Sequence, residues 1–281
     1  MQAKSKPPSD TAVASATVDR APRVGIILSS FKGGKDDWGS VTFPPLSQPV
    51  SPSEELTGAQ LREMARRAIE LGTARGGLGR VVGNGEAVVL LVSRDADPGL
   101  AQVVIELLKE QKRGDGITVI TSGDPAAARD SMQMPAPGIW SQRDVTYRVP
   151  KAILECDRLI SIAPLRIEKG RPSLTLDNFR ALAPSATGSP DVTALDLAGF
   201  HVPEYAILGG TYVFRDGDRV RHNLVIAGPK ATAVDSIGAA ILGLKPQEIP
   251  LLQLAEKRGY GEPNLNLLWT RGSTIKEAQV R

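Results

Sequence analysis

Short apolar runs alternate with amphipathic segments in the first half of this chain. Buried strands are predicted where such runs are bounded by Gly, Pro or polar residues: 24–28, 87–92 and 117–121. A helix is predicted to begin at the capping box formed by Thr57 and Gln60, and another at Asp97, which is followed by Pro98 in the first helical position. This strand–helix–strand order favours parallel strands with helices packed on the sheet.

The second half continues the pattern with shorter signals. Further strands are predicted at 158–163, 206–208, 212–214 and 224–227, and helices at 150–155, 231–242 and 247–258. Asp216-Gly217 is typical of a hairpin turn. The Gly-, Pro- and Ser-rich segments 32–52 and 124–143 are predicted to be loops. We therefore expect an α/β fold with one core and a mainly parallel or mixed central sheet covered by helices on both faces.

The pattern also sets the expected domain boundaries. Residues 1–22 contain Lys, Ser, Thr, Asp and Ala but no apolar stretch of the kind found in a signal peptide, so a disordered tail is predicted. No repeat or clean linker interrupts the remaining chain. Residues 23–281 are therefore predicted to form a single α/β domain.

Composition narrows the classes of function without selecting one. The 34 Lys and Arg residues nearly balance 31 Asp and Glu residues, and a net charge of +3 without clustering argues against binding to nucleic acid. No apolar run approaches the roughly 20 residues of a membrane helix. A single cysteine excludes an internal disulfide and fits a reducing compartment, so a cytoplasmic location is expected.

Two blocks of the second half carry a resemblance to a known family. One block reads NLVIAGPKATAVDSIGAAILGLKPQEIP at 223–250, followed by QLAEKRGYG at 253–261. The other spans 153–164 and continues to Leu174-Thr175-Leu176 and Asn178. In order and spacing these blocks resemble the bacterial domain of unknown function 362 family, whereas the first half matches it weakly. The resemblance implies no established activity.

Several polar positions depart from that family. Its members usually have Lys-Pro-Asn where this chain has SRDA at 93–96, and Lys-Thr-His where it has Arg166-Ile167-Glu168. A lysine of the family is replaced by Asp177. Some relatives carry an added iron–sulfur segment, for which this chain lacks the cysteines. If those positions bind an anion or a metal in the family, this protein is expected to bind something else or nothing.

Candidate ligand-binding residues follow a predicted central strand. Arg166, Lys169, Arg171 and Asn178 lie beyond residue 163, and ligands of open α/β sheets bind outside the carboxyl ends of the strands. An arginine there is suited to clamp a carboxylate in bidentate fashion. The alternatives are a solvated charge cluster for the basic residues and a turn cap for Asn178.

A second candidate lies between a predicted strand and a predicted helix. Gly228 and Lys230 belong to a Gly-Pro-Lys turn, whose free N–H groups suit a phosphate or carboxylate, although tight strand-to-helix packing explains the turn equally well. Asp235 lies three residues after Thr232, which favours a helix cap. Glu168 and Asp235 are the candidates for an acid or base, and no catalytic residue is assigned.

The sequence supports neither a metal site nor a reactive thiol. His201 and His222 are the only imidazoles, and no cysteine accompanies them in a metal-binding spacing. Cys156 lies between Glu155 and Asp157, whose carboxylates disfavour a thiolate, so an inert thiol is predicted. No cofactor is indicated by any motif.

Three functional hypotheses remain open. The first is a domain that binds a small anionic metabolite in a cleft formed by the loops after residues 92, 163 and 227. The second is an enzyme acting on such a metabolite, with Arg166 and Lys230 orienting the substrate. The third is a non-catalytic subunit that docks on a protein partner through segments 32–52 and 124–143.

Overall fold

The computed structural model describes residues 22–35, 42–73, 77–113, 116–137, 145–183, 186 and 188–280. The predicted tail therefore lies outside the described residues, except for Pro22. No helix in these ranges is long and apolar enough to cross a membrane.

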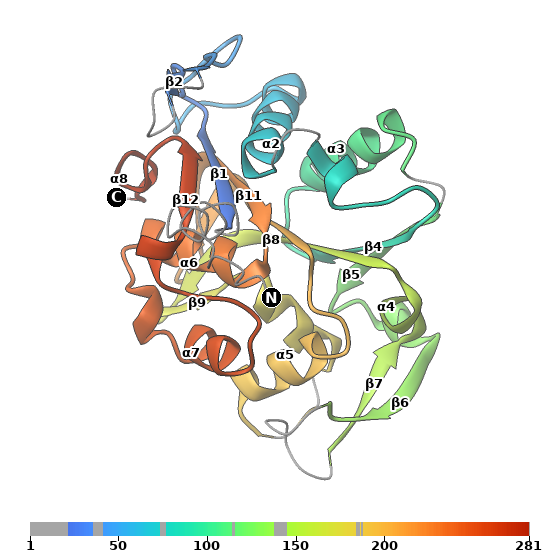
Figure 1. The fold of residues 1–281 in the computed structure, drawn as a ribbon. Coiled ribbons are helices and arrows are strands. Elements are labelled where there is room, and N and C mark those ends of the chain that lie inside the picture. Colours follow the sequence, from blue (N-terminus) through green and yellow to red (C-terminus); the bar gives the residue numbers. More distant parts are fainter. Residues whose placement is uncertain are drawn as a thin grey trace, which may run out of the picture.

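An eight-stranded mixed sheet forms the centre of the molecule, as predicted (Figure 1). Its order is β12-β1-β11-β10-β8-β4-β5, and β9 pairs with the end of β8. The strands are β1 (Arg23–Leu28), β4 (Ala87–Ser93), β5 (Gly116–Ser122), β8 (Arg158–Glu168), β9 (Arg171–Ser173), β10 (Tyr205–Arg215), β11 (Asp218–Pro229) and β12 (Trp269–Gly272). Only β11 and β9 pair antiparallel with their neighbours; the other described pairs in this sheet are parallel.

Helices cover both faces because the strand residues are apolar on both sides. Alternate residues of β8 enter different cores: Leu159 packs with the helices α4 (Lys151–Glu155), α5 (Pro190–Ala198), α6 (Ala231–Ile241) and α7 (Pro250–Lys257). Ile160 packs on the other face with α2 (Gly58–Gly72) and α3 (Pro98–Glu110). The same two-sided arrangement is visible in Figure 1. Such burial on both faces explains why the strands appear in the sequence as continuous apolar runs.

Three local signals at element ends were predicted correctly. Thr57 and Gln60 exchange both hydrogen bonds of a capping box at the start of α2. Asp97 caps α3 by accepting from Gly99 N at 3.0 Å. The Asp216-Gly217 turn joins β10 to β11, and both residues have positive φ, at 51° and 91°. These features depend on neighbouring residues only, so the sequence was sufficient to predict them.

Elements that depend on distant partners were missed or misjudged. Segment 124–143 was predicted to be a loop, yet it contains a short 3-10 helix (Pro125–Ala128) and β6 (Ser131–Pro135), which pairs with β7 (Thr146–Pro150). Helix α5 and strand β12 were also not predicted. The predicted strands at 206–208 and 212–214 are one strand, β10, with an irregularity between Gly210 and Tyr212. Segment 32–52 carries the small strands β2 (Gly34–Lys35) and β3 (Thr42–Phe43). The short helix α8 (Ile275–Ala278) follows β12.

The connections define a switch point between β4 and β8. These neighbouring strands are parallel, but β4 leads to α3 on one face while β8 leads through β9 and the 3-10 helix Leu176–Leu182 to α5 on the other. The two connections diverge and leave a crevice at the carboxyl ends of the strands. In open α/β sheets ligands bind at such a position.

A buried ion pair holds α5 against α7. Arg258 Nη1 donates to Asp196 Oδ1 at 2.8 Å, and Tyr147 Oη donates to Asp196 Oδ2 at 2.9 Å. The side chains of Arg258 and Asp196 are 3% and 0% exposed. Removal of the Arg258 charge would take the ion pair away from a carboxylate that is buried in the core.

We therefore expect Arg258→Met to lower the free energy of unfolding by about 3–5 kcal/mol, the usual loss when a buried pair is broken from one side. The matched control is Arg66→Met, because Arg66 pairs with Glu110 on the surface, where both side chains are about half exposed. Solvent screening makes the control loss far smaller. Urea unfolding followed by circular dichroism measures both, and equal losses would contradict the importance of the buried pair.

Candidate functional site

Two hollows open at the carboxyl ends of β4 and β8 and share Asp95 in their lining. The larger has a volume of about 530 Å³, and its floor includes Ser93 and Ser122, the last residues of β4 and β5. The smaller has a volume of about 310 Å³ and reaches to the β10–β11 hairpin. Together they occupy the switch point of the sheet.

Arg166 stands at the boundary between the hollows. Its guanidinium donates to Asp95 Oδ2 and, at 3.0 Å, to Glu168 Oε1. It also lies over the ring of Phe214, 4.7 Å from the ring centroid. The side chain is 23% exposed, so part of it remains accessible to a ligand. The sequence placed Arg166 in a loop beyond a strand that ended at residue 163, but β8 continues to Glu168 and Arg166 lies within its last residues, paired with Ser173 of β9.

Asp177 gathers two further arginines at the larger hollow. Its carboxylate is 3% exposed and accepts from Ser173 Oγ at 2.6 Å, from Arg180 Nη2 at 3.0 Å and from Arg171 Nη2 at 3.5 Å. Arg171 also donates to Asp191 at 2.7 Å. The side chains of Arg171 and Arg180 are each more than two-fifths exposed. Asp177 thus positions two cations at the rim.

Asn178 is buried under the larger hollow and is 6% exposed. Its Nδ2 donates to Ser161 Oγ and to the Ile162 carbonyl, both at 3.0 Å, and Ser161 donates in turn to the Thr175 carbonyl at 2.9 Å. The amide therefore ties the 3-10 helix to strand β8. Of the two interpretations offered by the sequence, the side chain lines the hollow and does not cap a turn.

Asp235 has a different role from the expected helix cap. Helix α6 begins directly after Lys230, so Thr232 and Asp235 lie inside it, and Thr232 Oγ1 donates to the Tyr260 carbonyl at 3.1 Å. The buried carboxylate of Asp235 instead accepts from Thr175 N at 3.0 Å, Thr175 Oγ1 at 2.6 Å and Leu176 N at 3.0 Å. It caps the 3-10 helix that carries Asp177, across 59 residues of sequence.

Glu168 and Asp235, the two candidates for acid–base chemistry, do not face each other. The side chain of Glu168 is 53% exposed and bound to Arg166. Asp235 is fully buried beneath the Thr175 backbone. Burial raises the pKa of Asp235 to about 7, against the opposing effect of its hydrogen bonds.

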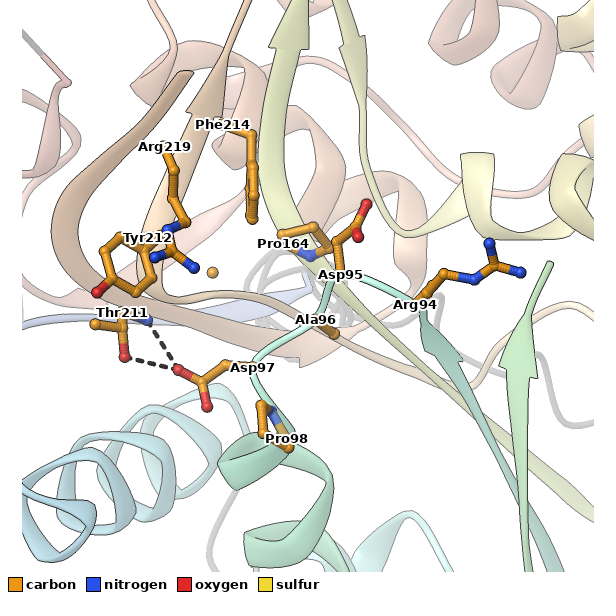
Figure 2. Close-up of a pocket in the computed structure, with 11 residues that line it drawn as sticks. Arg94, Asp95, Ala96, Asp97, Pro98, Pro164, Thr211, Tyr212, Phe214 and Arg219 are labelled. Atoms are coloured by element: carbon orange, nitrogen blue, oxygen red, sulfur yellow. Dashed lines mark hydrogen bonds between the residues drawn. The ribbon is translucent and has the colours of Figure 1, made fainter. Parts of the chain in front are cut away.

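The smaller hollow is organised by Asp97 (Figure 2). Besides capping α3, its carboxylate accepts from Thr211 N at 3.2 Å and Thr211 Oγ1 at 2.7 Å. A Cβ on Gly210, where φ is +124°, would lie 2.8 Å from the Asp97 Cβ, so glycine is needed for this close approach. Tyr212 and Arg219 lie on the hairpin side of the hollow, and the Arg219 guanidinium stacks 4.3 Å from the Tyr212 centroid. The hydrogen bonds between Asp97 and Thr211 could not be predicted from the sequence, because these residues are 114 positions apart.

Lys230 and Gly228 lie at the opposite edge of the sheet from Arg166. Strand β11 is antiparallel to β10, so its end at Pro229 pairs with Tyr205, which in turn pairs with Ile160 near the start of β8. From Ile160 to Arg166 the strand rises roughly 20 Å at ~3.3 Å per residue. The sequence predicted a cleft formed by the loops after residues 92, 163 and 227. The loop after residue 227 lies at the other end of the strands, so this part of the prediction is wrong. Strand direction, which apolar runs do not reveal, is the reason.

The remaining predicted residues have simple placements. Lys169 is in the β8–β9 turn with φ +49°, its backbone N–H donates to Asp216 Oδ1 at 2.6 Å, and its side chain borders the larger hollow. Gly228 lies inside β11, where a Cβ would approach the Arg23 carbonyl oxygen to 2.8 Å. Close strand packing, the alternative to anion binding, accounts for this glycine. Arg171, Arg180 and Asp95 complete the lining of the larger hollow. Arg171 belongs to the predicted cluster beyond the central strand, whereas Arg180 and Asp95 were not predicted as ligands.

The site defines an α/β protein with a charged crevice at a switch point of its sheet. Comparison of the chain with family models, with curated proteins and with solved structures finds no match in any of the three.

Asp235 should give the protein a pH-dependent stability. An ordinary Asp in the unfolded chain has a pKa near 3.9, so between about pH 4 and 7 the folded state holds a proton that the unfolded state releases. The free energy of unfolding contributed by this group therefore falls as the pH rises through that window and is constant above it.

In Asp235→Asn this contribution is absent, so the stability difference between wild type and variant should shrink as the pH rises from 4.5 to 7. Urea midpoints at several pH values measure it. Thr232→Val is the control, because it removes a hydrogen bond in the same helix without changing a titratable group. A difference for Asp235→Asn that is constant with pH would contradict the raised pKa.

Proposed function

We propose that this protein binds a small anionic metabolite in the larger hollow at the carboxyl ends of β4 and β8. The observation that carries the proposal is the grouping of Arg166, Arg171 and Arg180 around one accessible cavity at a switch point of the sheet. A guanidinium has five N–H donors in a fixed plane, so each arginine retains donors after pairing with a carboxylate. Those donors are suited to phosphate or carboxylate oxygens.

The balance of charge in the hollow also favours an anion. Four basic side chains, those of the three arginines and Lys169, contribute to a lining with the three carboxylates of Asp95, Glu168 and Asp177. Asp177 is buried and satisfied by Ser173 and the arginines, so it contributes little accessible negative charge. The serine hydroxyls of β4 and β5 add neutral donors at the base of the cavity.

The positions of Glu168 and Asp235 argue against acid–base catalysis by these carboxylates and favour a binding function. A carboxylate that exchanges protons with a substrate must reach it within hydrogen-bond distance. Asp235 is separated from the hollow by the Thr175 and Leu176 backbone, to which it is bonded. Glu168 reaches the hollow but is engaged by Arg166 in an exposed ion pair.

The resemblance to the domain of unknown function 362 family is part of the same proposal. Asp235 and Asn178 belong to the two sequence blocks that carry it, and both residues organise the 3-10 helix beneath the hollow. In this interpretation the resembled blocks supply the scaffold, while Arg166 and Asp177, which depart from the family, adapt the site. A cytoplasmic location is also proposed, because one unpaired cysteine suits a reducing compartment.

Titration calorimetry with inorganic pyrophosphate and with citrate tests the proposal. Arg166→Ala and Arg171→Ala should each weaken binding of the better probe at least about tenfold, or about 1.4 kcal/mol, because charge-assisted hydrogen bonds are lost. The matched control is Lys230→Ala, a cation at the opposite edge that should leave the Kd unchanged.

Two results would contradict this site. One is the absence of binding by either probe at a Kd below about 1 mM, equivalent to about 4 kcal/mol. The other is an equal weakening by Lys230→Ala and Arg166→Ala. Circular dichroism and thermal melting of each variant ensure that a loss of affinity does not reflect a loss of fold.

A further inference from the structure

A thiol, an imidazole and a carboxylate form a row at the amino-terminal edge of the sheet, away from the proposed anion site. Cys156 joins α4 to the start of β8, whereas His201 and Glu204 belong to the segment between α5 and β10. Because β8 and β10 are parallel neighbours, both segments lie at the same edge. None of the hydrogen bonds of the anion site involves these three residues.

The three side chains are in sequential contact. Cys156 Sγ lies 3.5 Å from His201 Nδ1, and His201 Nε2 lies 3.1 Å from Glu204 Oε1. Glu204 is itself fixed, because its Oε2 accepts from Leu159 N at 2.8 Å. A nucleophile, a base within hydrogen-bond reach and a third group that orients the base constitute the arrangement that activates cysteine nucleophiles.

The row is accessible from solvent. Cys156 is partly exposed, and the side chains of His201 and Glu204 are 16% and 30% exposed. Cys156 also packs against the apolar core, so this partial exposure favours reagents that are small. Within the described residues no group of three or more His, Cys, Asp and Glu side chains is placed to hold a metal ion.

The sulfur has two polar neighbours, His201 Nδ1 and the Ile153 carbonyl oxygen, each 3.5 Å from Sγ, and the nearby charged residues are engaged elsewhere. Arg158 is directed toward Glu86, with two hydrogen bonds of 2.9 Å, and lies 3.8 Å from Glu204. Asp157, next to Cys156 in the chain, accepts from Ala87 N at 2.8 Å.

Two further charged residues border the row. Glu155 is exposed, and Lys230 is exposed with its backbone N–H directed to the Glu204 carbonyl at 3.4 Å. The sequence predicted an inert thiol from the acidic neighbours of Cys156. It gave no sign of the imidazole, which comes from 45 residues away.

The protonation of His201 agrees with this geometry. Its hydrogen bond to Cys156, followed by that to Glu204, raises the pKa of His201 to about 10 despite partial burial. The hydrogen bonds at both ring nitrogens therefore favour the charged imidazolium. Glu204 stabilises the charge from the other side of the ring.

We propose that Cys156 is a reactive thiolate paired with the His201 imidazolium and that it undergoes thiol–disulfide exchange with small aliphatic disulfides. The sulfur attacks one sulfur of the reagent, a new S–S bond forms to Cys156, and the S–S bond of the reagent breaks. The released half leaves as a thiolate and takes a proton from solvent. Cys156 is thereby oxidised to a mixed disulfide while half of the reagent is reduced to a thiol.

The experiment uses the full chain, in which Cys156 is the only cysteine, so intact mass spectrometry reports this residue alone. Rates of modification by iodoacetamide and by oxidised glutathione are measured at pH 6 and pH 8 for wild type, His201→Gln and Glu204→Gln. His222→Gln is the matched control, because His222 contacts the Ala278 carbonyl and not the row. Circular dichroism establishes that each variant is folded.

At pH 6 the wild-type protein should react with iodoacetamide at least about tenfold faster than the cysteine of a short unstructured peptide, whose thiol pKa is near 8.5. His201→Gln should lose this advantage, Glu204→Gln should lose part of it, and His222→Gln should retain it. Oxidised glutathione should add one glutathionyl group to wild type and do so more slowly in His201→Gln.

The proposal is overturned if wild type reacts no faster than the peptide cysteine at pH 6, or if folded His201→Gln reacts as fast as wild type. It is also overturned if iodoacetamide reacts rapidly but oxidised glutathione adds nothing, because exchange with disulfides would then be absent. A purely structural role for His201 would change stability without changing the dependence of the rate on pH.

Discussion

The carboxylate of Asp235 is the contact on which the arrangement of the crevice depends. It belongs to the buried helix α6. Its oxygens accept hydrogen bonds from Thr175 N, Thr175 Oγ1 and Leu176 N, at the start of the 3-10 helix Leu176–Leu182. Unsatisfied N–H groups in that position would be costly, so the helix and the carboxylate stabilise each other. Because the helix is fixed in this way, Asp177 and Asn178 are held beneath the cavity at a defined height above β8.

Paired charges then shape the cavity without filling it. Asp177 is buried and holds Arg171 and Arg180 at the rim, while Asp95 holds Arg166 at the boundary of the two hollows. Arginines restrained by carboxylates lose less freedom when they meet a ligand than free side chains would. The same pairing places a carboxylate beside each arginine, so the cations lie together without strong mutual repulsion.

The two edges of the sheet carry different chemistry because the strands are parallel. The carboxyl ends of β4, β5 and β8 carry hydroxyl groups and arginines, whereas the amino ends of β8 and β10 bring together the row of Cys156, His201 and Glu204. Along β8 the two groups are separated by the apolar residues of the core. A ligand in the crevice and a reagent at the thiol would thus not compete for the same space.

The sequence by itself determined the features that neighbouring residues create. Apolar runs located the central strands, capping residues such as Thr57 and Asp97 marked helix starts, and Asp216-Gly217 marked the hairpin. It also placed Arg166 and Asn178 on the carboxyl-terminal side of a central strand, although Arg166 proved to lie inside the longer β8. These results require only the local preferences of the backbone and the pattern of burial.

Only the tertiary structure decided which of these features meet. The direction of β11 moved Lys230 to the far edge, and the packing of α6 against the 3-10 helix turned Asp235 from an expected cap of its own helix into the anchor of another. The proximity of Cys156 to His201 likewise arises from the pairing of β8 with β10. Contacts between residues far apart in the chain depend on strand order and direction, which one sequence does not encode in any local pattern.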